Sequence, residues 1–209
     1  MLKIKKIDAD WKEIKNECRN TINKEDTDKE PSKNFIRKLL ISEHSPIRLA
    51  TIKWRWEGIK SWVSVHFSRH WLGWDKFVST QRTDRTGKNR DESPQGALVN
   101  MDVNANAQAL INVSRWRLCY QASTETRKEM ENLKKAIRDA GQEEIAFCMQ
   151  PNCVYRGGCP EMKSCGYWKE ISNHFTIIEE SSDIENRYYV ADKIFYERVD
   201  RNYTKRTNR

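Results

Sequence analysis

The chain has 209 residues, which suffices for one domain with an appendage but not for two full-sized domains. Its formal net charge of +8 favours anionic partners such as nucleotides, nucleic acid or an acidic membrane surface. No stretch reaches the roughly 20 apolar residues of a membrane-spanning helix and the N-terminus lacks the apolar core of a signal peptide, so we expect a cytoplasmic protein that does not enter a membrane.

The first forty residues predict one strand and two helices. Residues 1–23 mix charges with spaced apolar residues, which indicates a short strand followed by a helical turn or two. The polar stretch 23–33 contains a proline and predicts a loop. In residues 32–41 the apolar residues recur every three or four positions, which predicts a short amphipathic helix.

Residues 48–56 predict a second strand, because apolar side chains alternate there with basic ones. The apolar positions of this strand are Ile52, Trp54 and Trp56. After Gly58 the apolar residues change to helical spacing, and this helix would carry Arg69 and His70 at its C-terminal end. A basic C-terminal end suits the helix dipole.

The second half of the chain predicts a loop, a long helix and a short strand. Gly, Pro and polar residues predict a loop in 80–96. We expect the longest helix in 104–140, with Asn106 and Arg117 on one face, because the residues between them step by three and four. Residues 188–190 predict a strand. The end of the chain is basic, through Arg198, Arg201, Lys205, Arg206 and Arg209.

The stretch from His66 to Arg90 combines guanidinium groups, imidazoles and hydroxyls with few acids. Trp and Phe side chains lie in the same segment. Planar rings beside fixed cations suit a ring-bearing phosphate ligand. The alternative is a solvated basic loop, since Lys and Arg side chains are mostly exposed.

Two motifs follow one another in this chain. The first is Arg69-His70-x, followed after seven residues by Ser79, and the second runs over residues 106–117. Together they resemble the signature segments of the flavin-dependent thymidylate synthases. Residues 18–21 and 44–46 are similar to two weaker segments of that family, so the resemblance covers roughly residues 10–137.

The resemblance implies an α+β fold, in which helices pack on an antiparallel sheet. We expect this fold in residues 1–140 and a Cys-rich extension in 141–209. Members of the family transfer a methylene group from methylenetetrahydrofolate to dUMP and reduce it with flavin electrons that NADPH supplies. The resemblance therefore implies an enzyme that uses FAD, folate and a pyrimidine deoxynucleotide, and a homotetramer whose sites are shared between subunits. The cofactor carries the chemistry, and the protein orients the reactants.

The resemblance also implies roles for individual residues. FAD would be held by Arg69, His70, Asn106, Asn112, Arg117, Thr21 and Ser45. The nucleotide would contact His66, Ser79, Arg82, Arg90 and Arg117. In the catalytic centre Ser79 would donate or accept a hydrogen bond rather than attack, since no paired base is evident. Arg90 would engage phosphate through its planar fork.

Four positions depart from the family pattern, and they concern the nucleotide pocket. They are His66, Trp71, Phe77 and Gln81. Each lost polar group removes a contact of about 1–3 kcal/mol to a charged or buried partner. Three hypotheses follow: a divergent thymidylate synthase, a flavin and folate enzyme for another pyrimidine nucleotide, and a non-catalytic module that binds a nucleotide or nucleic acid.

Four cysteines lie among glycines and prolines that supply turns, at Cys148, Cys153, Cys159 and Cys165. Four thiolates can close a tetrahedral zinc site, which here would hold the C-terminal extension together. The spacing is looser than that of paired Cys-x-x-Cys motifs, so structural zinc, an iron–sulfur cluster and free or disulfide-bonded thiols all remain open. Cys18 and Cys119 stand alone, and we expect both to be small buried hydrophobes.

Overall fold

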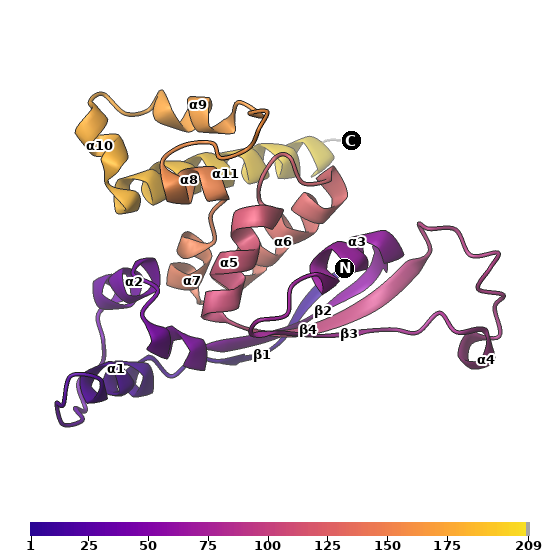
Figure 1. Cartoon of the computed structure of the whole chain (residues 1–209), viewed down its shortest axis with the longest axis horizontal. Helices are drawn as coiled ribbons and strands as arrows, with labels where there is room; N and C mark the ends of the chain where they lie inside the picture. The colour runs from indigo at the N-terminus through magenta and orange to yellow at the C-terminus, as the bar shows by residue number, and fades with distance from the viewer. Residues whose placement is uncertain (208–209) are drawn as a thin grey trace.

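A computed structural model describes residues 1–207, apart from the side chains of 178–179 and 200–207. An antiparallel sheet with helices packed on it confirms the α+β fold (Figure 1). The strands lie in the order β1-β2-β4-β3. Their bounds are Leu2–Asp8 for β1, Thr51–Lys60 for β2, Trp74–Val78 for β3 and Leu98–Asn106 for β4.

The helices of the first half lie close to where the sequence predicts them. Helix α1 spans Trp11–Asn20, α2 spans Lys33–Ile41, and a 3-10 helix, η1, spans Ser45–Leu49. Helix α3 (Ser61–Ser68) joins β2 to β3 where the sequence predicts a helix, but it ends at Ser68, so that Arg69 is its C-terminal cap and His70 lies beyond it. The loop before β4 carries the short helix α4 (Thr83–Thr86) and projects from the body of the molecule (Figure 1).

One face of the sheet forms the core, and tryptophans dominate it. Trp54 and Trp56 of β2 are fully buried, as their alternation with basic residues predicts. The Trp54 ring lies 5.3 Å from Trp56 and 5.2 Å from Trp74, and Phe67 of α3 stacks on Trp56 at 4.5 Å. Each such ring pair stabilises the fold by about 0.5–1.5 kcal/mol beyond its burial. The cluster therefore fixes the position of α3.

The opposite face of the sheet is polar. Asp102 of β4 accepts hydrogen bonds from Arg55 at 2.7 and 2.8 Å and from Lys5 at 2.9 Å. The hydrogen bonds from Arg55 have the largest effect on the pKa of Asp102. Together with the hydrogen bond from Lys5 they lower this pKa to about 2, although burial raises it. Phe77 pairs with Asp102 across the strands and lies exposed on this polar face.

The long helix predicted for residues 104–140 is wrong. Strand β4 continues to Asn106, and two helices follow it, α5 (Ala107–Arg117) and α6 (Thr124–Asp139). The Asn106 side chain accepts a hydrogen bond from the Ala109 N–H at 2.9 Å and so caps the start of α5. Ser123 caps α6 in the same way through Thr126. Asn106 thus marks where the strand ends and α5 begins, and Ser123 marks the start of a separate helix.

The remaining chain is helical and lies beyond α5 and α6, away from the sheet (Figure 1). Its helices are α7 (Glu143–Cys148), α8 (Asn152–Arg156), α9 (Tyr167–Ser172), α10 (Ile178–Ser182) and α11 (Ile184–Thr207). The strand predicted at 188–190 is therefore wrong. Tyr188, Ala191 and Ile194 are buried at helical spacing, and tertiary packing overrides the strand preference of Tyr and Val.

The structure describes only part of the basic end of the chain. Arg198 of α11 contacts Glu170 and the hydroxyl of Tyr120. The side chains of Arg201, Lys205 and Arg206, and the whole of Arg209, lie outside the described residues. Within residues 1–207, no helix combines the length and the apolar character needed to cross a membrane.

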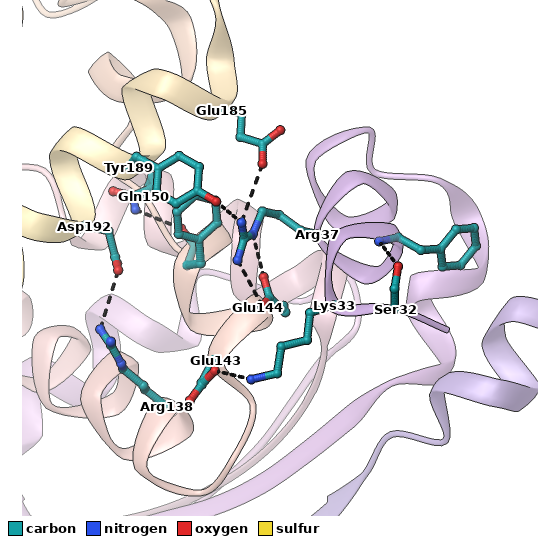
Figure 2. A network of polar contacts seen from close by, with 12 residues as sticks. Ser32, Lys33, Arg37, Arg138, Glu143, Glu144, Gln150, Glu185, Tyr189 and Asp192 are labelled. Carbon is teal, nitrogen blue, oxygen red and sulfur yellow. Dashed lines mark hydrogen bonds and ion pairs between the residues drawn. The ribbon is translucent and has the colours of Figure 1, made fainter. Parts of the chain in front are cut away.

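A polar network attaches the C-terminal helices to the N-terminal ones (Figure 2). The guanidinium of Arg37 in α2 lies 2.7 Å from Glu144 of α7 and 3.7 Å from Glu185 of α11, and it also bonds Tyr189. Arg37, Glu144 and Tyr189 border a pocket of about 450 Å³. The buried apolar residues of residues 141–207 belong to the same core as those of the sheet.

Candidate functional site

The ends of α3 and α5 meet beside the sheet, and two residues of the sequence motifs are joined there. Arg117 is the last residue of α5, and His70 follows α3 by two residues. The Nε of Arg117 donates a hydrogen bond to the Nε2 of His70 at 2.9 Å. Its Nη2 donates to the backbone carbonyl of His66 at 2.7 Å. One guanidinium therefore holds the end of α3 against the end of α5.

The surroundings of His70 keep its ring neutral. Burial, then the positive charges of Arg117 and Lys76, lower the pKa of His70 to about 4. The Lys76 ammonium donates to the His70 carbonyl at 2.6 Å, which holds this second charge in place. Because Nε2 accepts from Arg117, the neutral ring carries its proton on Nδ1. His70 therefore offers one N–H donor.

Arg117 is a half-buried cation that lacks a countercharge. Burial and the neighbouring Arg69 lower its pKa. In the part of the chain that the structure describes, Arg117 forms no ion pair with a carboxylate, and its partners are a neutral ring and a carbonyl. Two guanidinium groups without a carboxylate favour an anion, and phosphate groups suit their planar forks.

The turn after His70 is pressed against the start of α5. Gly73 has a φ of +63°, and the backbone N–H of Asn106 donates to the Gly73 carbonyl at 3.1 Å. A Cβ on Gly73 would lie 2.4 Å from the Asn106 Nδ2. Only glycine fits this close approach. The structure thus brings Arg69, His70 and Arg117 together at the end of α5, whereas Asn106 lies at the start of α5 beside Gly73.

The other residues predicted for the flavin lie apart from this group. Asn112 is exposed on α5, and its side-chain oxygen accepts from Gln108 at 3.4 Å and from Arg115 at 3.1 Å. The Thr21 hydroxyl donates to the Cys18 carbonyl at 2.8 Å at the end of α1. Ser45 is exposed at the start of η1. No hydrogen bond among the described residues connects these three side chains to Arg117.

His66 is tied to α6 rather than free for a nucleotide. Its Nδ1 lies 2.8 Å from the Thr126 hydroxyl. Burial, then the charges of Arg117 and Arg69, lower the pKa of His66. The ring is therefore neutral near pH 7, and it packs edge-on against Trp62.

The residues predicted for the nucleotide phosphate lie at and beyond the end of β3. The Ser79 hydroxyl accepts from the Asn100 N–H at 2.9 Å. The Arg82 guanidinium donates two hydrogen bonds to the Asp84 carboxylate, at 3.0 and 2.7 Å. Arg90 is exposed. The hydrogen bonds and ion pairs described for residues 1–207 do not join these three side chains to His70.

Of the four positions that depart from the family pattern, two are strongly exposed. Trp71 and Phe77 are 71% and 66% exposed. Because strand residues alternate between faces, Phe77 lies on the opposite face of β3 from Lys76, which contacts His70. Gln81 is half-buried and accepts from the Ser61 hydroxyl at 3.3 Å. Trp71 is thus the aromatic departure next to His70.

The four cysteines predicted to bind zinc do not form one group. Cys148 is buried in α7, where burial and then the neighbouring Glu144 raise the pKa of its thiol. Burial, then Cys119, Cys165 and Cys159, raise the pKa of the Cys153 thiol to about 12. Among the side chains that the structure describes, no three His, Cys, Asp or Glu residues are placed so that they could hold a metal ion. The described residues thus give no support to the predicted zinc set, which stays a prediction, and Cys119 lies near other cysteines.

Two residues of this region escaped the sequence analysis. Lys76 shares the inner face of β3 with the buried Trp74, and the alternation of the strand could have placed it there. Gly73 stands between two tryptophans at a turn, which could have signalled a close backbone approach.

No model of a protein family matches the sequence, and no curated protein does. Solved structures do match the fold. One is the UMP/dUMP methylase PolB from Streptomyces cacaoi bound with 5-Br dUMP, at 14% identity and a TM-score of 0.55, covering 72% of this chain and 95% of that one. Another is the flavin-dependent thymidylate synthase ThyX from Helicobacter pylori complexed with FAD and dUMP, at 12% identity and a TM-score of 0.56, covering 70% of this chain and 98% of that one. At such identities, the likeness shows that this chain shares their fold.

Proposed function

We propose that this protein is an FAD-dependent enzyme that methylates dUMP to dTMP with methylenetetrahydrofolate and NADPH. The contact between Arg117 and His70 carries the proposal, because it joins both sequence motifs in a cationic, partly buried region. The likeness in fold to proteins described with FAD and dUMP supports it.

The residues present fit the diphosphate of FAD. Arg117 and Arg69 are two adjacent cations, and no carboxylate among the described residues pairs with Arg117. His70 adds a neutral N–H donor, and the Nδ2 of Asn106 lies beside the turn at Gly73. These groups would bind and orient the cofactor. Bound FAD supplies the electrons that reduce the transferred carbon.

The nucleotide would bind through the loop that projects beyond β3. Asp84 pairs with Arg82 and not with Arg90. The exposed guanidinium of Arg90 therefore suits a phosphate. Since this loop projects from the body of one copy, we propose a homotetramer in which the loop of one subunit completes the site of another (Figure 1). The exposed side chains of Trp71, Leu72 and Trp116 provide apolar surface beside Arg117 for such an assembly.

A second candidate is methylation of UMP or another pyrimidine nucleotide. The exposed Trp71 next to His70 favours it, because this ring replaces a polar group of the family pattern. The solved PolB methylase, which is described with 5-Br UMP as well as 5-Br dUMP, shares the fold.

Tritium release from nucleotides labelled at C5 of the base tests both candidates. Purified full-length protein receives FAD, NADPH and methylenetetrahydrofolate together with labelled dUMP or UMP. We expect release that requires the folate, and a larger release with the true substrate. Arg117→Ala should abolish it, whereas Lys135→Ala, which removes an exposed charge of α6, should not.

Two results would contradict the proposal. Absence of release with both nucleotides in protein that binds FAD would exclude methylation of either. A colourless protein that retains oligonucleotide in a salt-dependent manner would favour the non-catalytic nucleic-acid module instead.

A further inference from the structure

One ring nitrogen of His66 contacts α6, and the other lies available beside two guanidinium groups. Its Nδ1 is 2.8 Å from the hydroxyl of Thr126, the third residue of α6. The hydrogen bonds described for residues 1–207 do not involve its Nε2. We propose that Thr126 is a positioning residue, which fixes the His66 imidazole as an Nε2–H donor to a phosphate oxygen of FAD bound at Arg117 and Arg69. FAD enters through the proposed function, on which this choice of ligand rests.

Two hydroxyls at the start of α6 set the direction of the contact with His66. The N–H of Thr126 donates to the Ser123 oxygen at 3.4 Å, and the Ser123 hydroxyl donates to the Thr126 oxygen at 2.7 Å. Each hydroxyl has one hydrogen, so that of Thr126 remains for the Nδ1 of His66. Thr126 is fully buried, where an unused donor would be unfavourable. Nδ1 is therefore an acceptor, and the neutral ring carries its proton on Nε2.

The position of the ring against the first turn of α6 favours the same tautomer. Backbone N–H groups without partners make the start of a helix positive, which attracts a nitrogen lone pair and repels an N–H. The acid of this turn, Glu125, could offset that field, but the Lys60 ammonium lies 3.3 Å from its carboxylate. The field of α6 and the two hydroxyls thus both favour a proton on the Nε2 of His66.

The His66 ring is held beside the cations of the candidate site. Trp62 packs edge-on against it, with 5.5 Å between ring centroids. The Nη2 of Arg117 donates to the backbone carbonyl of His66 at 2.7 Å. Burial, then the charges of Arg117 and Arg69, lower the pKa of His66, so the ring is neutral near pH 7. A half-buried N–H beside two guanidinium groups suits an anionic oxygen, because hydrogen bonds to ionised acceptors are the stronger ones.

His66 and His70 offer different nitrogens to the same ligand. His70 accepts from Arg117 through Nε2 and therefore donates through Nδ1. His66 accepts from Thr126 through Nδ1 and donates through Nε2. Because both rings are neutral, they add hydrogen bonds to a phosphate group without repelling Arg117.

Long-range proton–nitrogen NMR spectra of the full-length protein, labelled with 15N at histidine, identify the tautomer of each ring, and His66→Gln assigns the signals of His66. At neutral pH we expect the Nε2–H tautomer in the wild type and in Thr126→Ser, which keeps the hydroxyl. Thr126→Val removes the hydroxyl at nearly constant volume and should give a mixture of both tautomers. Thr124→Val is the matched control, because Thr124 is exposed on the same turn, and it should keep the wild-type tautomer.

Titration with FAD tests the ligand. FAD should move the Nε2 signal of His66 in the wild type. Thr126→Val should bind FAD about 2-fold more weakly, because about half of its rings then lack the donor before binding. His66→Phe should bind about 10-fold more weakly, since it loses a hydrogen bond to a charged group. Thr126→Ser and Thr124→Val should bind as the wild type does.

The Nδ1–H tautomer in the wild type, or an unchanged tautomer in folded Thr126→Val, would overturn the positioning role of Thr126. A His66 signal that moves with dUMP alone and not with FAD would overturn the choice of the FAD phosphate. Failure of the wild type to bind FAD would contradict the proposed function and the contact of His66 with FAD together. The tautomer spectra need no ligand, so they decide the role of Thr126 in either case.

Discussion

The Nε of Arg117 lies 2.9 Å from the Nε2 of His70, and this hydrogen bond joins residues that are 47 positions apart in the chain. It requires a neutral imidazole, since a protonated ring has no acceptor and would repel the guanidinium. Burial and the charge of Arg117 provide that neutrality, by lowering the pKa of His70 to about 4. The contact thus makes the candidate site sensitive to acid.

We expect acid to weaken the fold through His70. Its pKa is about 4 in the folded protein and near 6.5 in the unfolded chain, so the unfolded chain binds more protons between these values. The free energy of unfolding should therefore fall as the pH is lowered from 6.5 to 4. Urea titrations across this range measure it, and His70→Asn should flatten the dependence. Equal slopes for the wild type and His70→Asn would contradict this.

Gly73→Ala should destabilise the protein and weaken the candidate site. A positive φ alone costs an alanine about 1–2 kcal/mol, and the new Cβ must also displace the Asn106 side chain. Gly87→Ala is the matched control, since its φ is +69° and nothing lies within 4 Å of the added Cβ. Urea unfolding should show a larger loss for Gly73→Ala. Equal losses in both variants would show that the Asn106 contact is unimportant.

The local patterns in the sequence predict most elements of the first half. Trp54 and Trp56 alternate with basic residues, and that alternation survives in the structure because one face of β2 is buried and the other is polar. The same signal is present at Val99, Met101, Val103 and Ala105, all buried on β4. The helical spacing that begins at Asn106 obscured it, because the strand runs directly into the helix that Asn106 caps.

Other features depend on contacts between distant residues. The helical spacing between Asn106 and Arg117 gives no information about Lys76, which contacts His70 from β3. Cys119 lies 29 residues before the Cys-rich segment begins at Cys148, and only the packing of α5 on α8 brings it to Cys153. The residues adjacent to Lys76 and Cys119 in the sequence do not predict these contacts.

The buried ion pair between Lys134 of α6 and Asp192 of α11 should hold the C-terminal helices in place. Lys134 is 1% exposed, and its ammonium lies 2.8 Å from the Asp192 carboxylate. Asp192→Asn leaves this charge without a partner and should cost about 3–5 kcal/mol of unfolding free energy. Lys134→Met in the same chain should recover part of that loss, because the unpaired charge is then absent.

Asp139→Asn provides the control for this pair. It removes an exposed partner of Lys135 on the same helix, and such pairs contribute only about 0.3–0.5 kcal/mol. Urea unfolding of the three variants distinguishes the two cases. A loss for Asp192→Asn no larger than that for Asp139→Asn would show that the pair does not stabilise the docking of α11.

Titration of FAD, followed by quenching of its fluorescence, tests most directly whether Arg117 and His70 form a flavin site. We predict saturable binding to the wild type and to Lys135→Ala. Arg117→Ala should bind at least about 10-fold more weakly, because a hydrogen bond to a charged group contributes about 1.5–3 kcal/mol. Absence of binding to the wild type, or equal affinity in folded Arg117→Ala, would contradict the account.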